Sequence, residues 1–206
     1  MAGRGLLAVI SAPSGGGKGT IMKELFAQDD NLRLSVSATT RAPRPGEEHG
    51  KAYYFISREE FESLIAQGKM LEHAEYVGNY YGTPRDPVED WLSKGHDVVL
   101  EIEVQGGAQV KKIMPECVSI FILPPSMKVL EERLRGRGTE EEETLQKRLS
   151  AARQEIPHAK EYDYIVCNDR LEDAVADILA ILRAEKLRYS RNTDSAERVL
   201  NNAETV

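Results

Sequence analysis

The sequence predicts an α/β fold in which a parallel β-sheet is flanked by helices. Residues 6–10 form an uninterrupted aliphatic run, which is typical of a strand that is covered on both faces of a sheet. Similar runs at 97–102 and 118–123 alternate with segments of helical periodicity. With 206 residues and 41% hydrophobic content, the chain can bury a full core as one domain with a small insertion.

A glycine-rich turn with a lysine follows the first predicted strand. Consecutive small residues let several backbone N–H groups point inward, and the next helix, predicted at 20–27, adds the positive end of its dipole. A lysine there can reach the β- and γ-phosphates of a nucleotide, and a hydroxyl can donate to a phosphate oxygen. The segment therefore predicts a nucleoside triphosphate site. Its residues are Ala12, Pro13, Ser14, Gly15, Gly16, Gly17, Lys18, Gly19 and Thr20.

This loop departs from the general P-loop pattern at two positions. Ala12 replaces the first glycine, and Gly19 replaces the Ser or Thr whose hydroxyl usually ligates Mg²⁺. The order Gly19-Thr20 resembles the adenylate kinase version of the loop. The alternative, a flexible glycine turn without a ligand, is disfavoured by the preceding strand and the lysine.

Charge and cysteine usage narrow the class of protein. A formal net charge of −7 argues against a general nucleic-acid binder, which needs a basic surface. No apolar run is long enough for a signal peptide or a membrane span, so we expect a cytoplasmic protein with no membrane partner. Cys117 and Cys167 lie in apolar runs and are predicted to be buried free thiols.

Residues 38–85 are predicted to form an insertion with its own β character. A strand at 33–37 leads into a proline-rich loop, on which Arg41 and Arg44 could hold a second phosphate. A solvated basic turn is the alternative for this loop. The loop is followed by a short strand at 53–55 and by a helix opened by Ser57. Two further strands are predicted at 70–76 and 79–83, joined at Gly78.

The core pattern resumes with a helix at 86–94 and the buried strand at 97–102. Glu101 and Glu103 follow at its carboxyl end, where open α/β sheets bind their ligands, so both are candidates for contact with hydrated Mg²⁺ or with substrate. A helix that follows Gly106 and Gly107 should run to 113.

An arginine-rich helical hairpin follows the strand at 118–123. Its first helix opens at Ser126, and its basic residues include Arg133, Arg137 and Arg148. The hairpin is either a charged surface element held by pairs four residues apart or a lid whose arginines close over phosphates. The chain ends with a strand at 164–166, a core helix capped by Asp169, and a polar tail from about 191.

The chain resembles the guanylate kinases over residues 5–188. The resemblance rests on SAPSG at 11–15, SATTRAPRPGE at 37–47, GNYYG at 78–82, EIEVQG at 101–106, RLRGRG at 133–138 and VCND at 166–169. It implies a P-loop NTPase-type core at 1–37, 86–132 and 155–190, a mixed α/β GMP-binding insertion at 38–85, a helical lid at 133–154 and a tail at 191–206.

The resemblance also implies roles for individual residues. It places Arg41, Arg44, Tyr53 and Tyr81 on the GMP phosphate with Glu47 orienting them, and Ser37, Glu72, Thr83 and Glu101 on the guanine. It places Asn168 near the adenine of ATP, and assigns the transferring phosphoryl group to Lys18, Arg41, Arg133, Arg137 and Arg148. A carboxylate suits guanine, because guanine presents two adjacent donors, whereas adenine presents an acceptor at N1. An unpaired buried polar group costs about 1–3 kcal/mol, so such a site discriminates strongly.

The implied reaction is ATP plus GMP giving ADP plus GDP. Guanylate kinases usually carry Ser or Thr after the loop lysine, so Gly19 predicts that Mg²⁺ is held through water, phosphates and Glu101 or Glu103. The family also suggests a homodimer. Two alternatives are a non-catalytic guanylate-kinase-like interaction module and another nucleoside monophosphate kinase. The loop lysine and arginines argue against the first, and the carboxylates at 72 and 101 argue against the second.

Overall fold

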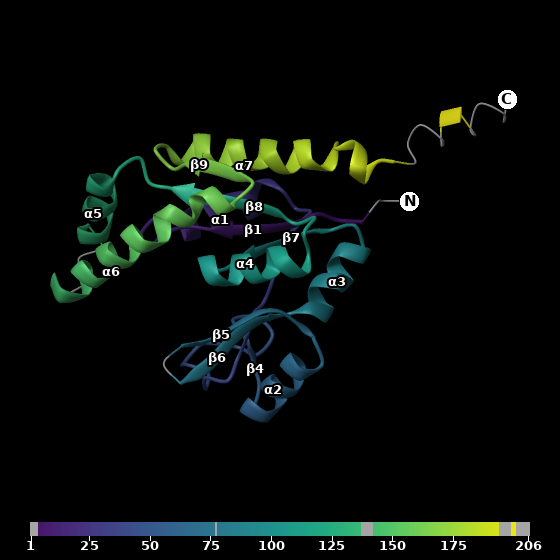
Figure 1. Ribbon diagram of the computed structural model, residues 1–206, viewed down its shortest axis with the longest axis horizontal. Helices are drawn as coiled ribbons and strands as arrows, with labels where there is room; N and C mark the ends of the chain where they lie inside the picture. Colours follow the sequence, from purple (N-terminus) through teal and green to yellow (C-terminus); the bar gives the residue numbers. More distant parts are fainter. Residues whose placement is uncertain (1–3, 77, 137–141, 194–198, 201–206) are drawn as a thin grey trace.

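The protein contains a five-stranded parallel sheet and a separate four-stranded sheet (Figure 1). A computed structural model describes residues 4–76, 78–136, 142–193 and 199–200. The larger sheet has the order β2-β7-β1-β8-β9, and every strand pair in it is parallel. Its strands are β1 (Leu7–Ser11), β2 (Leu32–Leu34), β7 (Asp97–Glu101), β8 (Val118–Leu123) and β9 (Tyr164–Cys167). The predicted parallel α/β fold is thereby confirmed.

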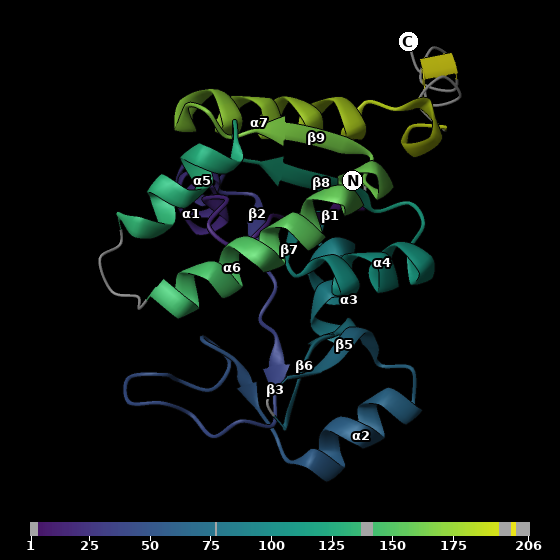
Figure 2. The same cartoon turned by 60° about the vertical axis from the view of Figure 1, so that its left-hand side comes forward.

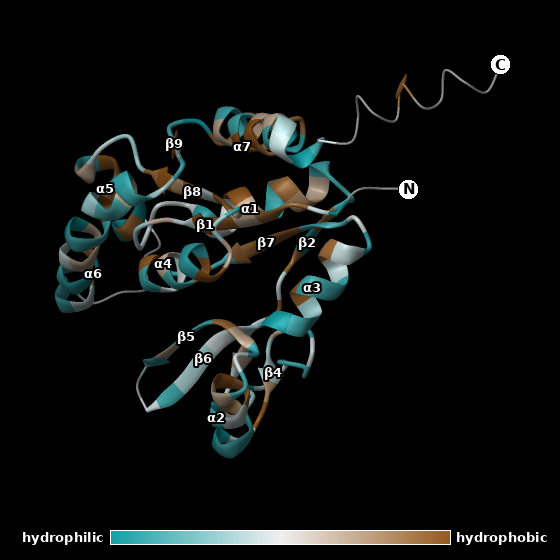
Figure 3. Cartoon of the chain, turned by 45° about the vertical axis from the view of Figure 1, so that its right-hand side comes forward, coloured by the Kyte–Doolittle hydropathy of each residue, from teal (hydrophilic) through white to brown (hydrophobic). Residues whose placement is uncertain are grey.

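Helices cover both faces of this sheet, which explains why its strands are continuous aliphatic runs. Ala8 and Ile10 of β1 pack with residues of α1 and α7, whereas Leu7 and Val9 pack with residues of α3 and α4. Figure 3 shows the hydrophobic residues gathered in these strands between the helices. The helices are α1 (Lys18–Gln28), α3 (Arg85–Ser93), α4 (Val104–Ile113) and α7 (Leu171–Lys186).

The smaller sheet lies beyond α3 and α4, on the side of the molecule away from α7 (Figures 1 and 2). Its order is β4-β3-β6-β5, and helix α2 packs on it through the buried Phe61. The Ser57 side chain caps α2 by accepting from the Glu60 N–H, as predicted. The elements are β3 (Ala38–Thr39), β4 (Tyr54–Phe55), α2 (Arg58–Ala66), β5 (Met70–Tyr76) and β6 (Asn79–Pro84).

A helical hairpin flanks the carboxyl edge of the larger sheet. Helices α5 (Met127–Arg135) and α6 (Glu142–Glu155) pack through a leucine-rich cluster, and a 3₁₀ helix, η1 (Ile156–Glu161), leads from α6 to β9. Ser126 caps α5 by accepting from the Val129 N–H. A second 3₁₀ helix, η2 (Tyr189–Arg191), follows α7. No helix in the described part of the chain is both long and apolar enough to cross a membrane.

Several predicted boundaries were wrong for local physical reasons. Helix α1 begins at Lys18 because Gly17 adopts a left-handed φ of 89°, which ends the loop there. Helix α4 begins at Val104, so Gly106 and Gly107 lie inside it rather than before it. Asp169 does not cap α7, whose N-cap residue is Arg170 and makes no side-chain cap bond.

The two cysteines differ in burial. Cys117 is buried, and burial raises the pKa of its thiol to about 11, which makes it a poor nucleophile. The prediction that Cys167 is buried was wrong, because it is exposed at the end of the edge strand β9. Both thiols are free.

Candidate active site

The glycine-rich loop between β1 and α1 is fixed by contacts from distant parts of the chain. The Asn168 side-chain amide donates to the Gly16 carbonyl at 2.9 Å, and Asn168 is only 6% exposed. A Cβ at Gly17 would lie 2.3 Å from the Asn168 amide nitrogen, so only glycine fits there. Asn168, predicted near the adenine, therefore supports the backbone of the loop.

Lys18 lies where the loop meets the end of β7. Its Nζ donates to the Ile102 carbonyl at 3.4 Å and lies 3.8 Å from Glu103 Oε1. Glu101 and Glu103 are exposed at this carboxyl edge of the sheet. Thr20 is exposed in the first turn of α1, and a Cβ added at Gly19 would meet nothing within 4 Å. One cation and two carboxylates thus lie together where the loop meets the end of β7.

Arg41, Glu47 and two tyrosines gather on the proline-rich loop and its neighbours. One Arg41 nitrogen donates to both Glu47 oxygens at 3.0 Å, and the Arg44 N–H donates to Glu47 at 2.8 Å. These bonds hold the pKa of Glu47 below its ordinary value, first through Arg44 and then through Arg41. The guanidinium of Arg41 lies 5.6 Å from the Tyr53 ring centre, and the Tyr53 and Tyr81 rings are 6.0 Å apart. The Arg44 side chain is exposed.

Glu72 and Thr83 form a buried polar pair between the neighbouring strands β5 and β6. The Thr83 hydroxyl donates to Glu72 Oε1 at 2.7 Å, and Glu72 is 8% exposed. Burial raises the pKa of Glu72, and the hydrogen bonds from Thr83 oppose the shift only in part. A Cβ at Gly106 would lie 3.0 Å from the other Glu72 oxygen, so this glycine lets α4 approach the carboxylate. Ser37, also predicted to read the guanine, is half-buried, and its carbonyl accepts from the Tyr54 N–H.

The helical hairpin brings Arg133 to the loop. Arg133 donates to the Asn168 carbonyl at 2.9 Å, while its other terminal nitrogen, Nη1, is buried without a hydrogen-bond partner among the residues that the structure describes. Arg148 is half-buried on α6, and Arg137 lies outside the described residues. Arg135 is bound by Glu131 and Glu142, and it lowers the pKa of Glu142 to about 2. Arg133 thus offers the unsatisfied donor, whereas Arg135 has a structural role.

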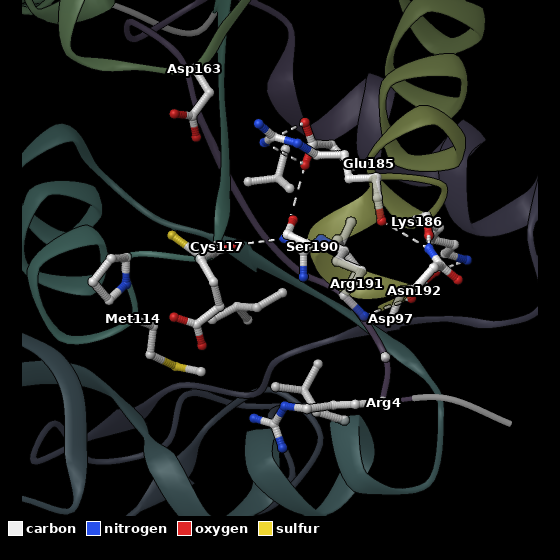
Figure 4. A pocket seen from close by; sticks show the side chains of 18 of the residues that line it. Arg4, Asp97, Met114, Cys117, Asp163, Glu185, Lys186, Ser190, Arg191 and Asn192 are labelled. Carbon is white, nitrogen blue, oxygen red and sulfur yellow. Dashed lines mark hydrogen bonds and ion pairs between the residues drawn. The ribbon is translucent and has the colours of Figure 1, made fainter. Parts of the chain in front are cut away.

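A pocket of about 960 Å³ lies at the opposite, amino-terminal edge of the larger sheet (Figure 4). Its cations are already paired with acids, because Lys186 contacts Asp97, Arg188 lies 3.2 Å from Glu185, and Lys111 lies 2.6 Å from Asp163. Such paired charges offer little to a phosphate group. Lys18, Glu101 and Glu103 instead lie at the carboxyl edge of the larger sheet, which is the usual ligand site of α/β folds.

Comparisons with known proteins agree with this geometry. A family model described as guanylate kinase matches residues 4–185. The chain belongs to the guanylate kinase family. It is 55% identical to a guanylate kinase from Streptococcus thermophilus, covering 93% of this chain and 92% of the relative, and 54% identical to one from Desulfitobacterium hafniense, covering 91% and 94%.

A crystal structure of guanylate kinase from Anaplasma phagocytophilum is similar in three dimensions. Its TM-score is 0.71 with 42% sequence identity, and the match covers 92% of this chain and 90% of that one. Guanylate kinases are ATP:GMP phosphotransferases. Neither alternative, the interaction module or another nucleoside monophosphate kinase, gains support from these comparisons.

The sequence analysis missed three contributions to this guanylate-kinase site. Gln109 of α4 exchanges two hydrogen bonds with the backbone of His73, at 3.1 and 3.0 Å, and so ties β5 to the core. Glu155, at the end of α6, accepts from the Ser14 N–H at 3.2 Å. The Tyr162 hydroxyl is buried against Gly107. Each contact comes from one isolated polar side chain, and such a residue gives no sequence signal for the distant group that it contacts.

Proposed function

We propose that the loop carrying Lys18 binds the triphosphate of ATP and that the smaller sheet binds GMP, so that the γ-phosphoryl group passes directly between them. The reaction is that of the guanylate kinase family, ATP plus GMP giving ADP plus GDP. The observation that carries the proposal is the buried Nη1 of Arg133, which has no hydrogen-bond partner in the described part of the chain and lies beside the glycine-rich loop. A buried donor without an acceptor is costly, and a phosphate oxygen would satisfy it.

On the ATP side, the backbone N–H groups of the loop and the N-terminus of α1 receive the phosphates. Lys18 contributes the point charge, and Arg133, Arg137 and Arg148 contribute charge from the hairpin. Asn168 maintains the shape of the loop through its hydrogen bond to the Gly16 carbonyl. In the proposed complex, Asn168 also lies near the adenine of ATP. Ala12, Pro13, Gly15, Gly19 and Thr20 complete the loop.

On the GMP side, Arg41, Arg44, Tyr53 and Tyr81 receive the phosphate. Glu47 holds the Arg41 guanidinium in place. The Arg41 side chain therefore loses less conformational entropy when a phosphate binds. The Glu72 carboxylate accepts the two donors of guanine, with Thr83, Ser37 and Glu101 around the base. Ordering both substrates and stabilising the transferring charge supply the catalysis, because phosphoryl transfer needs little proton chemistry.

The residues at the end of β7 fit Mg²⁺ as a cofactor that is held largely by water and phosphates. The described residues contain no group of three or more acidic, histidine or cysteine ligands. Mg²⁺ commonly binds through one or two carboxylates plus substrate phosphates, and Glu101 and Glu103 are placed to supply them. When bound, the ion would neutralise charge on the phosphates.

Replacing Gly19 with serine tests how this ion is held. A serine Cβ fits because nothing lies within 4 Å, and the new hydroxyl restores the usual Mg²⁺ ligand. We expect Gly19→Ser to retain activity and to lower the Mg²⁺ concentration that gives the half-maximal rate about two- to tenfold. This range corresponds to the net free energy of about one hydrogen bond. Gly19→Ala adds the Cβ without the hydroxyl and is the control. An identical Mg²⁺ titration for both variants would contradict the idea.

The division into core, GMP-binding insertion and lid belongs to the same proposal. We propose that the insertion at about 38–85 and the hairpin at about 133–154 move towards the core to exclude water from the phosphates. The homodimer suggested by the family stays a prediction, and light scattering at several protein concentrations tests it.

The function is tested by measuring ADP release from ATP and Mg²⁺ with GMP, AMP, CMP or UMP as acceptor. We expect rapid turnover with GMP alone. Turnover with AMP instead would contradict the assignment of the guanine-reading residues. Absence of turnover with every acceptor would contradict the assignment of the phosphate-transfer site.

A further inference from the structure

Glu155 links the hairpin directly to the phosphate-binding loop. It is the last residue of α6, and its Oε2 accepts a hydrogen bond from the Ser14 N–H at 3.2 Å. The chain then enters η1, whose Ala159 is buried in a core cluster with Val104 and Phe121. Glu155 therefore lies where α6 joins a segment anchored to the core.

The carboxylate of Glu155 is held at the Ser14 N–H within electrostatic range of Lys18. Partial burial raises the pKa of Glu155, the hydrogen bond from Ser14 opposes that shift, and the charges of Glu103 and Lys18 act on it in opposite directions. A P-loop lysine reaches the β- and γ-phosphates, so the proposed ATP site brings the terminal phosphate into the same neighbourhood. A fixed negative charge at that position opposes a second one.

We propose that Glu155 is a positioning residue that occupies the place of a terminal phosphate oxygen at the Ser14 N–H until ATP displaces it. The inference rests on the proposed function, because it requires the loop to be the ATP site. Binding of the γ-phosphate then exchanges one acceptor of the Ser14 N–H for another. Release of Glu155 removes the hydrogen bond between this loop and the carboxyl end of α6, the helix that carries Arg148.

The consequence is a difference between ATP and ADP. ADP lacks the phosphate that competes with Glu155, so it binds with less disturbance of the contact. Both helices of the hairpin touch the loop, because Gly15 packs against Leu130 and Leu134 of α5. Displacement of Glu155 therefore removes one of the connections between hairpin and loop, and it couples occupancy of the γ-phosphate position to hairpin movement.

The test is calorimetric binding of ADP and of a non-hydrolysable ATP analogue to the full chain at fixed Mg²⁺ without GMP. Glu155→Gln keeps an oxygen that accepts from Ser14 but removes the charge. We expect the variant to bind the ATP analogue about three- to tenfold more tightly and to change ADP affinity less than about twofold. Glu143→Gln, an exposed position on the same helix, is the matched control and should change neither affinity.

Glu155→Ala serves as a second variant, and the melting temperature of each variant confirms that it folds. Under the proposal, the alanine variant also binds the ATP analogue more tightly relative to ADP. An unchanged ratio of the two affinities in both variants, or weaker binding of both nucleotides by Glu155→Ala, would overturn the proposal and leave Glu155 a structural support of the loop. If the parent protein bound neither nucleotide, the proposed ATP site itself would fail, which is a distinguishable result.

Discussion

Lys18→Ala is expected to lower kcat about a hundred- to a thousandfold. The lysine places a charge between the loop and the end of β7, 3.4 Å from the Ile102 carbonyl. Under the proposed function, this charge stabilises the transferring phosphoryl group. Removing a preorganised charge of this kind costs about 2.7–4 kcal/mol in comparable sites. Steady-state ADP release with saturating ATP, GMP and Mg²⁺ measures the effect.

The control for this loss is Lys23→Ala, an exposed lysine on the same helix. It removes the same charge from α1 at a position away from the loop, and it should leave kcat within about twofold, since surface charges contribute little. Equal rates for the parent and Lys18→Ala would show that Lys18 does not act on the phosphates.

Glu72→Gln is expected to weaken GMP binding about ten- to a hundredfold and to reduce the preference for GMP over AMP. In the proposed role, the parent carboxylate accepts two guanine donors together, whereas the glutamine amide presents one donor of its own towards them. Hydrogen bonds to a charged group are worth about 1.5–3 kcal/mol, which sets this range. Calorimetric titration with GMP and the ratio of kcat/KM for the two acceptors measure both effects.

The same substitution is expected to raise the melting temperature of the unliganded protein. Burial raises the folded-state pKa of Glu72, so folding favours its protonated form. That contribution is fully present below the unfolded-state pKa and is lost as pH rises through the folded-state pKa, above which the buried carboxylate is ionised. Glutamine is uncharged throughout and can still accept from Thr83. The gain in melting temperature should therefore be largest above the folded-state pKa of Glu72 and shrink as the pH falls below it.

Glu75→Gln is the matched control for both readouts. Glu75 lies on the same strand but is about half-exposed near Arg58, so its neutralisation should change neither GMP affinity nor the melting temperature appreciably. If Glu72→Gln bound GMP as tightly as the parent, the role of Glu72 in reading guanine would be wrong. A lower melting temperature in the unliganded variant would contradict the unfavourable burial of its charge.

The fold was largely predictable because its strands are buried on both faces. Continuous aliphatic runs identify such strands, and the structure has β1, β7 and β8 within a residue of the expected positions. Errors occurred where a local pattern was overridden by packing. Gly106 and Gly107 read as a helix start, yet they lie inside α4, where Glu72 and the Tyr162 hydroxyl leave little room for a Cβ.

The sequence by itself determined the parallel α/β fold, the glycine-rich loop between the first strand and helix, and the polar groups that the proposed site draws on, because these depend on residue types within short segments. Only the tertiary structure decided which distant groups support that loop. Asn168 reaches Gly16 across 152 residues, and Glu155 reaches Ser14 across 141. These contacts depend on the order of strands in the sheet and on how α6 joins it, and no local periodicity encodes that arrangement. The hydrogen bonds to the Gly16 carbonyl and from the Ser14 N–H therefore form only when the chain is fully packed.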